Sequence, residues 1–300
     1  SAGRNIGFQT EVGSVSHPEI ESLRRFLSEE AINKYPDCGE RLEYGGSIHD
    51  EWAYWKHLPF TDATGVDHIC QFFNVPPYEN NTSSHRVDSI EDYSWAAQFA
   101  QYLQYKSLVE GYSYRMWEWY SAMIIWKTSS PSPTFRGALY DWYLSTNGGY
   151  WGTRAGLAGG GPVRLILNLN NWTVTIVNTL PTPISAIFVH WRAYSLRKGK
   201  LEAYGDIPIP TQQVEGGSVA HTERSVKWEG NKHKRLSVIL YRLELSYHHH
   251  DDDMGSTRTV SNSYYLTNPS KGGYEPRYSL LGVIRKVGPR VNLDTQCTIS

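Results

Sequence analysis

The chain has 300 residues, a length that predicts about two domains and allows a sizeable hydrophobic core. Apolar residues make up 40% of the sequence, and 29 lysines and arginines nearly balance 30 aspartates and glutamates. This composition excludes a chain that is disordered throughout, and the near-neutral charge argues against nucleic acid or an anionic membrane as a partner. No apolar run approaches the roughly 18 residues that span a bilayer, so we expect no membrane partner.

Aromatic residues make up 13% of the chain and include 11 tryptophans and 21 tyrosines. Flat rings of this kind stack on sugars or fill a large core, and composition alone leaves both possibilities open. The chain opens on Ser1 and its first methionine is Met116, which suggests a processed chain or a fragment.

The three cysteines show neither a CxxC pair nor the spacing of zinc ligands, and we expect no metal site and no cofactor. N-glycosylation sequons begin at Asn80, Asn81 and Asn171. They are compatible with the secretory route, so the expected location is secreted or vacuolar/lysosomal.

A strand followed at once by a helix is predicted near the start of the chain. Residues 4–12 form an apolar run between glycines, which predicts a buried strand that ends near Glu11. Ser16 and Glu19 have the spacing of a capping box, and residues 20–27 carry apolar side chains at helical spacing. Strand, turn and helix in this order are typical of half of a β/α barrel unit or a doubly wound unit.

Five further segments are predicted before residue 145. Residues 35–86 are rich in Gly, Pro, Asn and aromatics, which predicts a long loop of the kind that is usually functional. A long helix is expected over 88–119 and a fully buried strand over 121–126. A turn and a shorter helix over 136–144 follow.

The pattern changes after the glycine-rich segment 156–162, which predicts a linker. Beyond it the apolar residues alternate with polar ones, and turns separate the runs. This pattern predicts an antiparallel sandwich of roughly 100 residues or more. The alternating positions are Val163, Leu165, Leu167 and Leu169; Trp172, Val174 and Ile176; Ile187, Val189, Trp191 and Ala193; and Leu236, Val238 and Leu240.

The run HHHDDD at residues 248–253 lies between two predicted strands. A metal site and a solvated hairpin tip are both compatible with it. Because a histidine tract carries little specificity without a second ligand cluster, we favour the hairpin tip.

Glu11 and Trp126 each end a predicted buried strand. In barrel enzymes the loops at the carboxyl ends of the strands form the active site, so a carboxylate at that position is a candidate catalytic group. Taken alone, Glu11 is equally explained as a helix cap and Trp126 as a core or rim aromatic. Gly7 and Gly13, on either side of Glu11, permit close packing or an unusual turn.

Four segments taken together resemble glycoside hydrolase family 2, in the branch of mannosylglycoprotein endo-β-mannosidases and exo-β-D-glucosaminidases. They are GFQTEVGSVSHPEIESLRRFL (7–27), AQYLQYKSLVEGYSYRMW (100–117), IIWKTSSP (124–131) and RGALYDWYLSTNGGYWGTR (136–154). The resemblance covers residues 5 to about 178 in order. It implies an α/β plus all-β chain, the C-terminal portion of a (β/α)8 TIM barrel followed by an immunoglobulin-like β-sandwich. The implied domains are 1–160 (barrel), 161–290 (sandwich) and 291–300 (start of a further β-domain).

The resemblance also implies roles for single residues. Glu11 aligns with the catalytic nucleophile and Trp126 with a residue that lines the sugar subsite, while Trp55, His57 and Lys127 are further candidates for substrate contact. The implied chemistry is a retaining displacement by two carboxylates on β-mannosyl or β-glucosaminyl bonds, with no metal.

The chain departs from the family in two ways. The acid/base glutamate of the family lies upstream of the part matched here, so we expect the isolated chain to be inactive. Its partners are then a carbohydrate substrate and the N-terminal part of the same enzyme or precursor. Ser130-Pro131-Ser132 stands where the family typically has Asn-Pro-Trp, which favours an alternative, a non-catalytic carbohydrate-binding or structural protein derived from a glycosidase.

Overall fold

The computed structural model describes residues 7–13, 17–35, 50–56, 89–135, 138–158, 161–186, 188–195, 199–227, 238–249 and 256–267. The chain divides into two compact units. We call residues 1–9, 109–122 and 154–300 the sheet unit, and residues 10–108 and 123–153 the helix unit. In the described ranges, no helix has the length and apolar character that a membrane crossing requires. The domain boundary expected near residue 160 stays a prediction.

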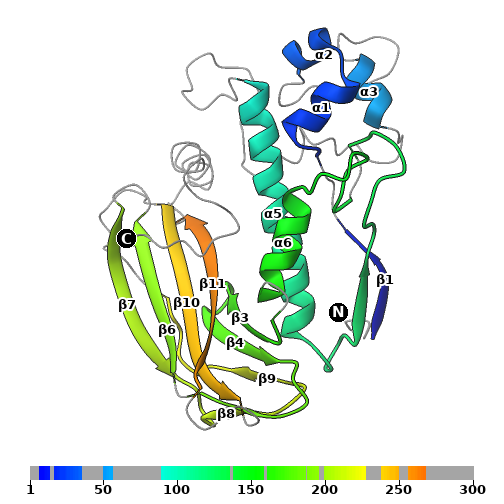
Figure 1. Cartoon of the computed structure of the whole chain (residues 1–300). Coiled ribbons are helices and arrows are strands. Elements are labelled where there is room, and N and C mark those ends of the chain that lie inside the picture. Colours follow the sequence, from blue (N-terminus) through cyan, green and yellow to red (C-terminus); the bar gives the residue numbers. More distant parts are fainter. Residues whose placement is uncertain are drawn as a thin grey trace. The chain divides into compact units, whose positions relative to one another are not determined.

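The sheet unit holds two antiparallel sheets (Figure 1). The smaller has the order β3-β4-β9, with β3 (Val163–Asn168), β4 (Thr173–Asn178) and β9 (Ser218–His221). The larger has the order β7-β6-β10-β5-β8, and β11 pairs with β10. Its strands are β5 (Ile184–Ser185), β6 (Phe188–Ser195), β7 (Lys200–Pro208), β8 (Gln213–Val214), β10 (Val238–His249) and β11 (Arg258–Thr267).

One hydrophobic core is shared by the two sheets, because alternate residues of each strand point to the same side. The predicted alternation is confirmed for β3, β4 and β6, and Leu169 is its exception, since it lies past the end of β3 and is exposed. The core residues of these three strands include Val163, Leu165, Leu167, Val174, Ile176, Val189 and Ala193.

For β10 the prediction is confirmed only in part. Of the even-numbered positions that the sequence pattern assigned to the core, Leu240 is buried, but the core shared by the two sheets takes the odd-numbered Ile239, Tyr241, Leu243 and Leu245. The start of this strand is apolar at successive positions, so its pattern fits either phase until the charged residues begin. Leu236 and Ile187 lie outside the described residues.

Helix α5 spans Ile90–Tyr114, and its last turns, from Val109 on, belong to the sheet unit, where they carry a buried carboxylate. Glu110 is 6% exposed, and its Oε1 accepts hydrogen bonds from Asn262 Nδ2 at 2.7 Å and from the Tyr264 hydroxyl at 2.9 Å. Asn262 also donates to the Leu165 carbonyl, and the Leu167 amide donates to the Tyr264 oxygen. The network therefore joins the helix to β3 and β11. The helix was predicted to reach residue 119 and ends at Tyr114 instead.

The helix unit begins with three short helices, α1 (Ile20–Phe26), α2 (Glu29–Asn33) and α3 (Asp50–Lys56). The predicted capping box is wrong, because the N-cap of α1 is Glu19, without a side-chain cap, and Ser16 lies outside the described residues. The long loop expected over 35–86 contains α3, so this part of the prediction is also wrong. Trp52 anchors α3 in the helix unit, because its side chain is buried and its Nε1 donates to the Ala31 carbonyl at 2.9 Å.

The shorter helix expected over 136–144 is also wrong, and the helix comes later, as α6 (Gly148–Gly156). Asp141 Oδ1 accepts hydrogen bonds from the amides of Tyr143 and Ser145, which holds a turn in place of a helix. Asn147 Oδ1 then accepts from the amides of Gly149 and Tyr150, the arrangement of a helix N-cap.

Two glycines allow α6 to lie against α5. A Cβ atom on Gly148 would lie 1.9 Å from the Gln98 carbonyl oxygen, and one on Gly152 would lie 2.1 Å from that of Tyr102. Both pairs are four residues apart on their helices, so one turn of each helix faces one turn of the other. The glycines that weaken α6 as an isolated helix thus make its packing possible.

We predict that Gly152→Ala destabilises the chain by about 1–3 kcal/mol, because the added methyl group meets backbone atoms that have no free rotation. Gly111→Ala is the matched control, since a Cβ there meets nothing within 4 Å. It should stabilise α5 by about 0.5–1 kcal/mol. Chemical denaturation of both variants checks the pair, and equal effects would contradict the close helix contact.

His17 lies in an aromatic cluster of the helix unit, and its ring centroid is 5.1 Å from that of Tyr93 and 5.4 Å from that of Phe135. Its Nδ1 donates to the Pro18 carbonyl at 2.9 Å. Its Nε2 is buried and meets no hydrogen-bond partner among the described residues. Burial lowers the pKa of His17 from its ordinary 6.5 to about 4, and the hydrogen bond to Pro18 opposes this only in part.

The free energy of unfolding should therefore fall as the pH drops from 6.5 to 4. In this window the unfolded chain binds a proton on His17 that the native chain does not, at a cost that reaches about 3 kcal/mol. His17→Phe keeps a ring and cannot bind the proton, so its stability should depend less on pH. Denaturation at pH 7 and pH 4.5 checks this, and parallel losses in both proteins would contradict the assignment.

Candidate active site

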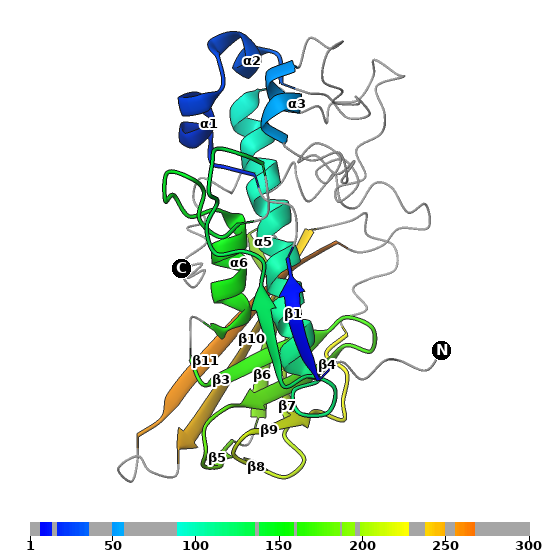
Figure 2. The same ribbon diagram turned by 90° about the vertical axis from the view of Figure 1, so that its right-hand side faces the viewer.

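The site is built on two neighbouring strands, β1 (Phe8–Val12) and β2 (Ala122–Ile125). The Ser121 amide donates to the Gly7 carbonyl, and the Trp126 amide donates to the Val12 carbonyl at 2.7 Å. Since both residue numbers rise by five between these bonds, the strands run parallel. Figure 2 shows β1, in dark blue, beside β2, in blue-green.

The two strands are formed as predicted but are not buried as predicted. Glu11 is exposed, and every residue of both strands is either exposed or half-buried, with strict alternation in β2 alone. Phe8, Ile124 and Trp126 each leave about half of their side-chain surface open, at 50%, 53% and 52%. The physical reason is that, within the described residues, the two strands pair only with each other.

A glycine brings the ends of the two strands together. A Cβ atom on Gly13 would lie 2.3 Å from the Trp126 carbonyl oxygen and 3.5 Å from the Tyr105 hydroxyl. Gly7, at the other end of β1, has room, because its Cβ would lie 4.0 Å from Ser121 Oγ. The expected close packing is thus confirmed at Gly13. It leaves Glu11 two residues from the point where the main chains meet.

The other predicted substrate contacts lie in different places. Lys127 directly follows Trp126, through a cis peptide bond, and its carbonyl accepts a hydrogen bond from the Leu139 amide at 3.1 Å. Trp55 is half-buried on α3, and its ring packs edge-on against Phe26 and Tyr54. Its neighbour Trp52 belongs to the core. His57 lies outside the described residues.

Glu19 is a carboxyl group of the helix unit with a shifted pKa, and nothing in the sequence indicated it. Burial raises the pKa of Glu19, and the charges of Asp141 and Glu21 raise it further. Asp141 is itself buried at the turn before α6. The two carboxyls are 122 positions apart in the chain, and no spacing motif connects them. Such a pairing is visible only once the helix unit has formed.

The histidine tract gives no metal centre in the described part of the chain, where no group of three or more His, Cys, Asp or Glu side chains could hold an ion. His248 Nδ1 donates to the Ser256 carbonyl, and His249 Nε2 is hydrogen bonded to Thr182 Oγ1 at 2.7 Å. Residues 250–253 lie outside the described residues.

Known protein-family profiles give no match to the chain. Its sequence is 28% identical over 196 residues to a mannosylglycoprotein endo-beta-mannosidase of Lilium longiflorum, a match that covers 64% of this chain and 19% of the relative. It is 29% identical over 157 residues to an exo-beta-D-glucosaminidase of Arthroderma benhamiae, covering 50% of this chain and 15% of the relative.

A solved structure of the Amycolatopsis orientalis exo-chitosanase CsxA shares the fold, with a TM-score of 0.62 and 18% identity. The likeness covers 88% of this chain and 28% of CsxA. The chain thus spans about a fifth of the curated relatives it matches, or less. These similarities support a relationship between this chain and glycosidases of the kind found in glycoside hydrolase family 2.

Proposed function

We propose that the chain supplies the nucleophile and part of the sugar subsite of a retaining glycoside hydrolase that acts on β-mannosyl or β-glucosaminyl linkages. The observation that carries the proposal is the juxtaposition of Glu11 and Trp126. They stand at the ends of parallel neighbouring strands and are held together where Gly13 meets the Trp126 carbonyl. The similarity to an endo-beta-mannosidase and an exo-beta-D-glucosaminidase supports the substrate class.

In this proposal β1 and β2 belong to a (β/α)8 barrel, and the two sheets form an immunoglobulin-like sandwich. Catalytic groups of such barrels lie at the carboxyl ends of the strands, the position of Glu11. Glu11 attacks the anomeric carbon, while a second carboxyl group about 5 to 5.5 Å away protonates the leaving oxygen and later activates water. Trp126 offers an open indole face to the sugar ring.

The second carboxyl group would come from the remainder of the same enzyme, which we propose as the partner of this chain. Within the described residues β1 and β2 pair only with each other, so the outer edge of each offers main-chain groups to which further barrel strands would bond. The exposed side chains of Phe8 and Ile124 would then be covered by other parts of the same enzyme. The secretory or vacuolar/lysosomal location remains part of the proposal.

We predict that Glu11→Gln, in this chain joined to the remainder of the enzyme, lowers the hydrolysis of an aryl β-mannoside or β-glucosaminide by about three orders of magnitude or more. The amide keeps the size of the carboxylate and lacks its nucleophilic oxygen. A 2-deoxy-2-fluoro glycoside should label Glu11 in the unmodified protein, as mass spectrometry of the peptide will show. Full turnover by the variant, or turnover by the chain alone, would contradict the proposal.

Gly13→Ala tests whether the packing of the strand ends matters for the chemistry. We expect a loss of kcat of about tenfold or more in the joined enzyme, since the methyl group would meet the Trp126 carbonyl and push the end of β1, which carries Glu11, away from the end of β2. Gly7→Ala lies on the same strand with open space around it and should leave kcat unchanged. Equal rates in the two variants would argue against the positioning role of Gly13.

A further inference from the structure

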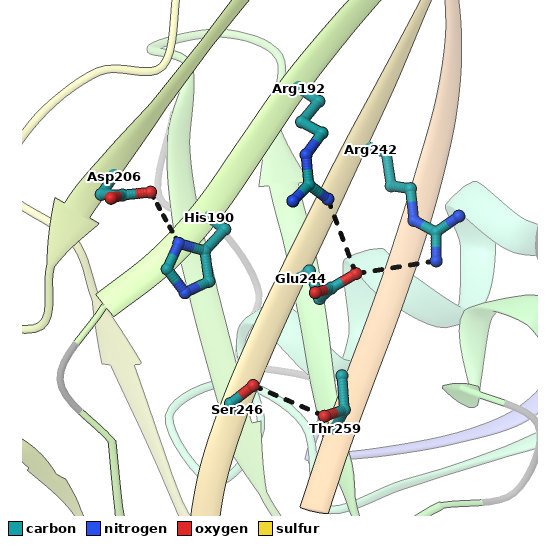
Figure 3. Close-up of polar contacts among 7 residues, drawn as sticks. All are labelled: His190, Arg192, Asp206, Arg242, Glu244, Ser246 and Thr259. Carbon is teal, nitrogen blue, oxygen red and sulfur yellow. Dashed lines mark hydrogen bonds and ion pairs between the residues drawn. The ribbon is translucent and has the colours of Figure 1, made fainter. Parts of the chain in front are cut away.

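The larger sheet of the sheet unit presents polar and aromatic side chains on the side opposite its core. Val189 and Ala193 of β6 point into the core, so His190 and Arg192 point the other way. The register places Asp206 of β7 and Glu244 of β10 beside His190 on this side. Figure 3 shows these side chains together on neighbouring strands. We call this surface the polar face.

Two arginines on the polar face share one glutamate. Arg192 lies directly opposite Arg242 across β6 and β10, and like charges in opposite positions repel. Glu244 lies between them, 3.8 Å from Arg192 Nη1 and 3.6 Å from Arg242 Nη2, which makes both ion pairs loose. The side chains of Arg242 and Glu244 are 15% and 25% exposed, and that of Arg192 is 42% exposed. Hydrogen-bond donors and acceptors thus lie side by side, with Arg192 the more open of the two arginines.

The remaining groups of the polar face are an oriented histidine and two exposed rings. His190 Nδ1 lies 2.6 Å from Asp206 Oδ1, which fixes the direction of the imidazole. Tyr204 lies opposite Arg192 and is 75% exposed, while Phe188 lies opposite Pro208 and is 43% exposed. Phe188 therefore lies beyond His190 along β6, and Tyr204 lies beside Arg192 on β7.

We propose that the polar face binds a neutral oligosaccharide. Two arginines balance Asp206 and Glu244, so an anionic ligand meets the carboxylates and a cationic ligand meets the guanidinium groups. A hydroxyl-rich ligand without charge uses donors and acceptors alike, and its C–H surfaces stack on Tyr204 and Phe188. The choice of a glycan among neutral polyols rests on the proposed function.

The test is calorimetric titration of the chain with mannohexaose, alongside the cationic glucosamine hexamer and an anionic uronic acid hexamer. We expect mannohexaose to bind and the charged oligomers to bind more weakly. Tyr204→Ala, and separately Phe188→Ala, should weaken binding of mannohexaose about tenfold. Thermal unfolding of each variant confirms that the fold is kept.

Trp117→Ala is the matched control, because Trp117 is another exposed aromatic of the sheet unit, at 64%, on the turn after α5. It should bind mannohexaose as the unmodified chain does. The proposed function is tested separately, by hydrolysis in the joined enzyme, so a failure of the proposed nucleophile is distinguishable from a failure of binding at the polar face. The inference is overturned if no variant of the polar face alters binding, if mannohexaose does not bind, if a charged oligomer binds more tightly, or if Trp117→Ala abolishes binding.

Discussion

The sheet unit depends on a carboxylate that is taken out of water. A buried charge without partners costs several kcal/mol, and both Asn262 and Tyr264 donate hydrogen bonds to Glu110. The same two side chains also bond the main chain of β3, at Leu165 and Leu167. One polar network therefore links the end of α5, strand β3 and strand β11, although Glu110 and Asn262 are 152 residues apart in the chain.

Much of the strand pattern was predictable, because a strand that buries one side has apolar residues at every second position of its sequence. The core residues of β3 and β4 follow from that period alone. The same argument was only partly right for β10, where consecutive apolar residues are buried on both sides of the strand. The helix α6 was missed for a different reason: its glycines, Gly148 and Gly152, predict a turn locally and are explained only by the backbone of α5, about 50 residues away.

In the candidate site, too, the residues could be chosen from the sequence, whereas their burial and their contacts with distant segments could not. The resemblance to a known family selected Glu11 and Trp126, and the pairing of β1 with β2 brings the ends of their strands together. Burial was overestimated for both strands, since an apolar sequence does not reveal how many neighbours a strand has. The pKa of Glu19 is raised first by burial and then by the charge of Asp141, and no pattern in the sequence connects these two residues.

Strand β10 is 12 residues long and serves three neighbours, with β11 along one edge and β6 and then β5 along the other. If it slipped by one residue, Arg242 and Glu244 would turn into the core while Leu243 and Leu245 turned to solvent. The slip would destabilise the pairing with β11 and the pairing with β6 at the same time, so the slipped register is strongly disfavoured. The charges of the polar face thus help to specify the register of β10 in the sheet.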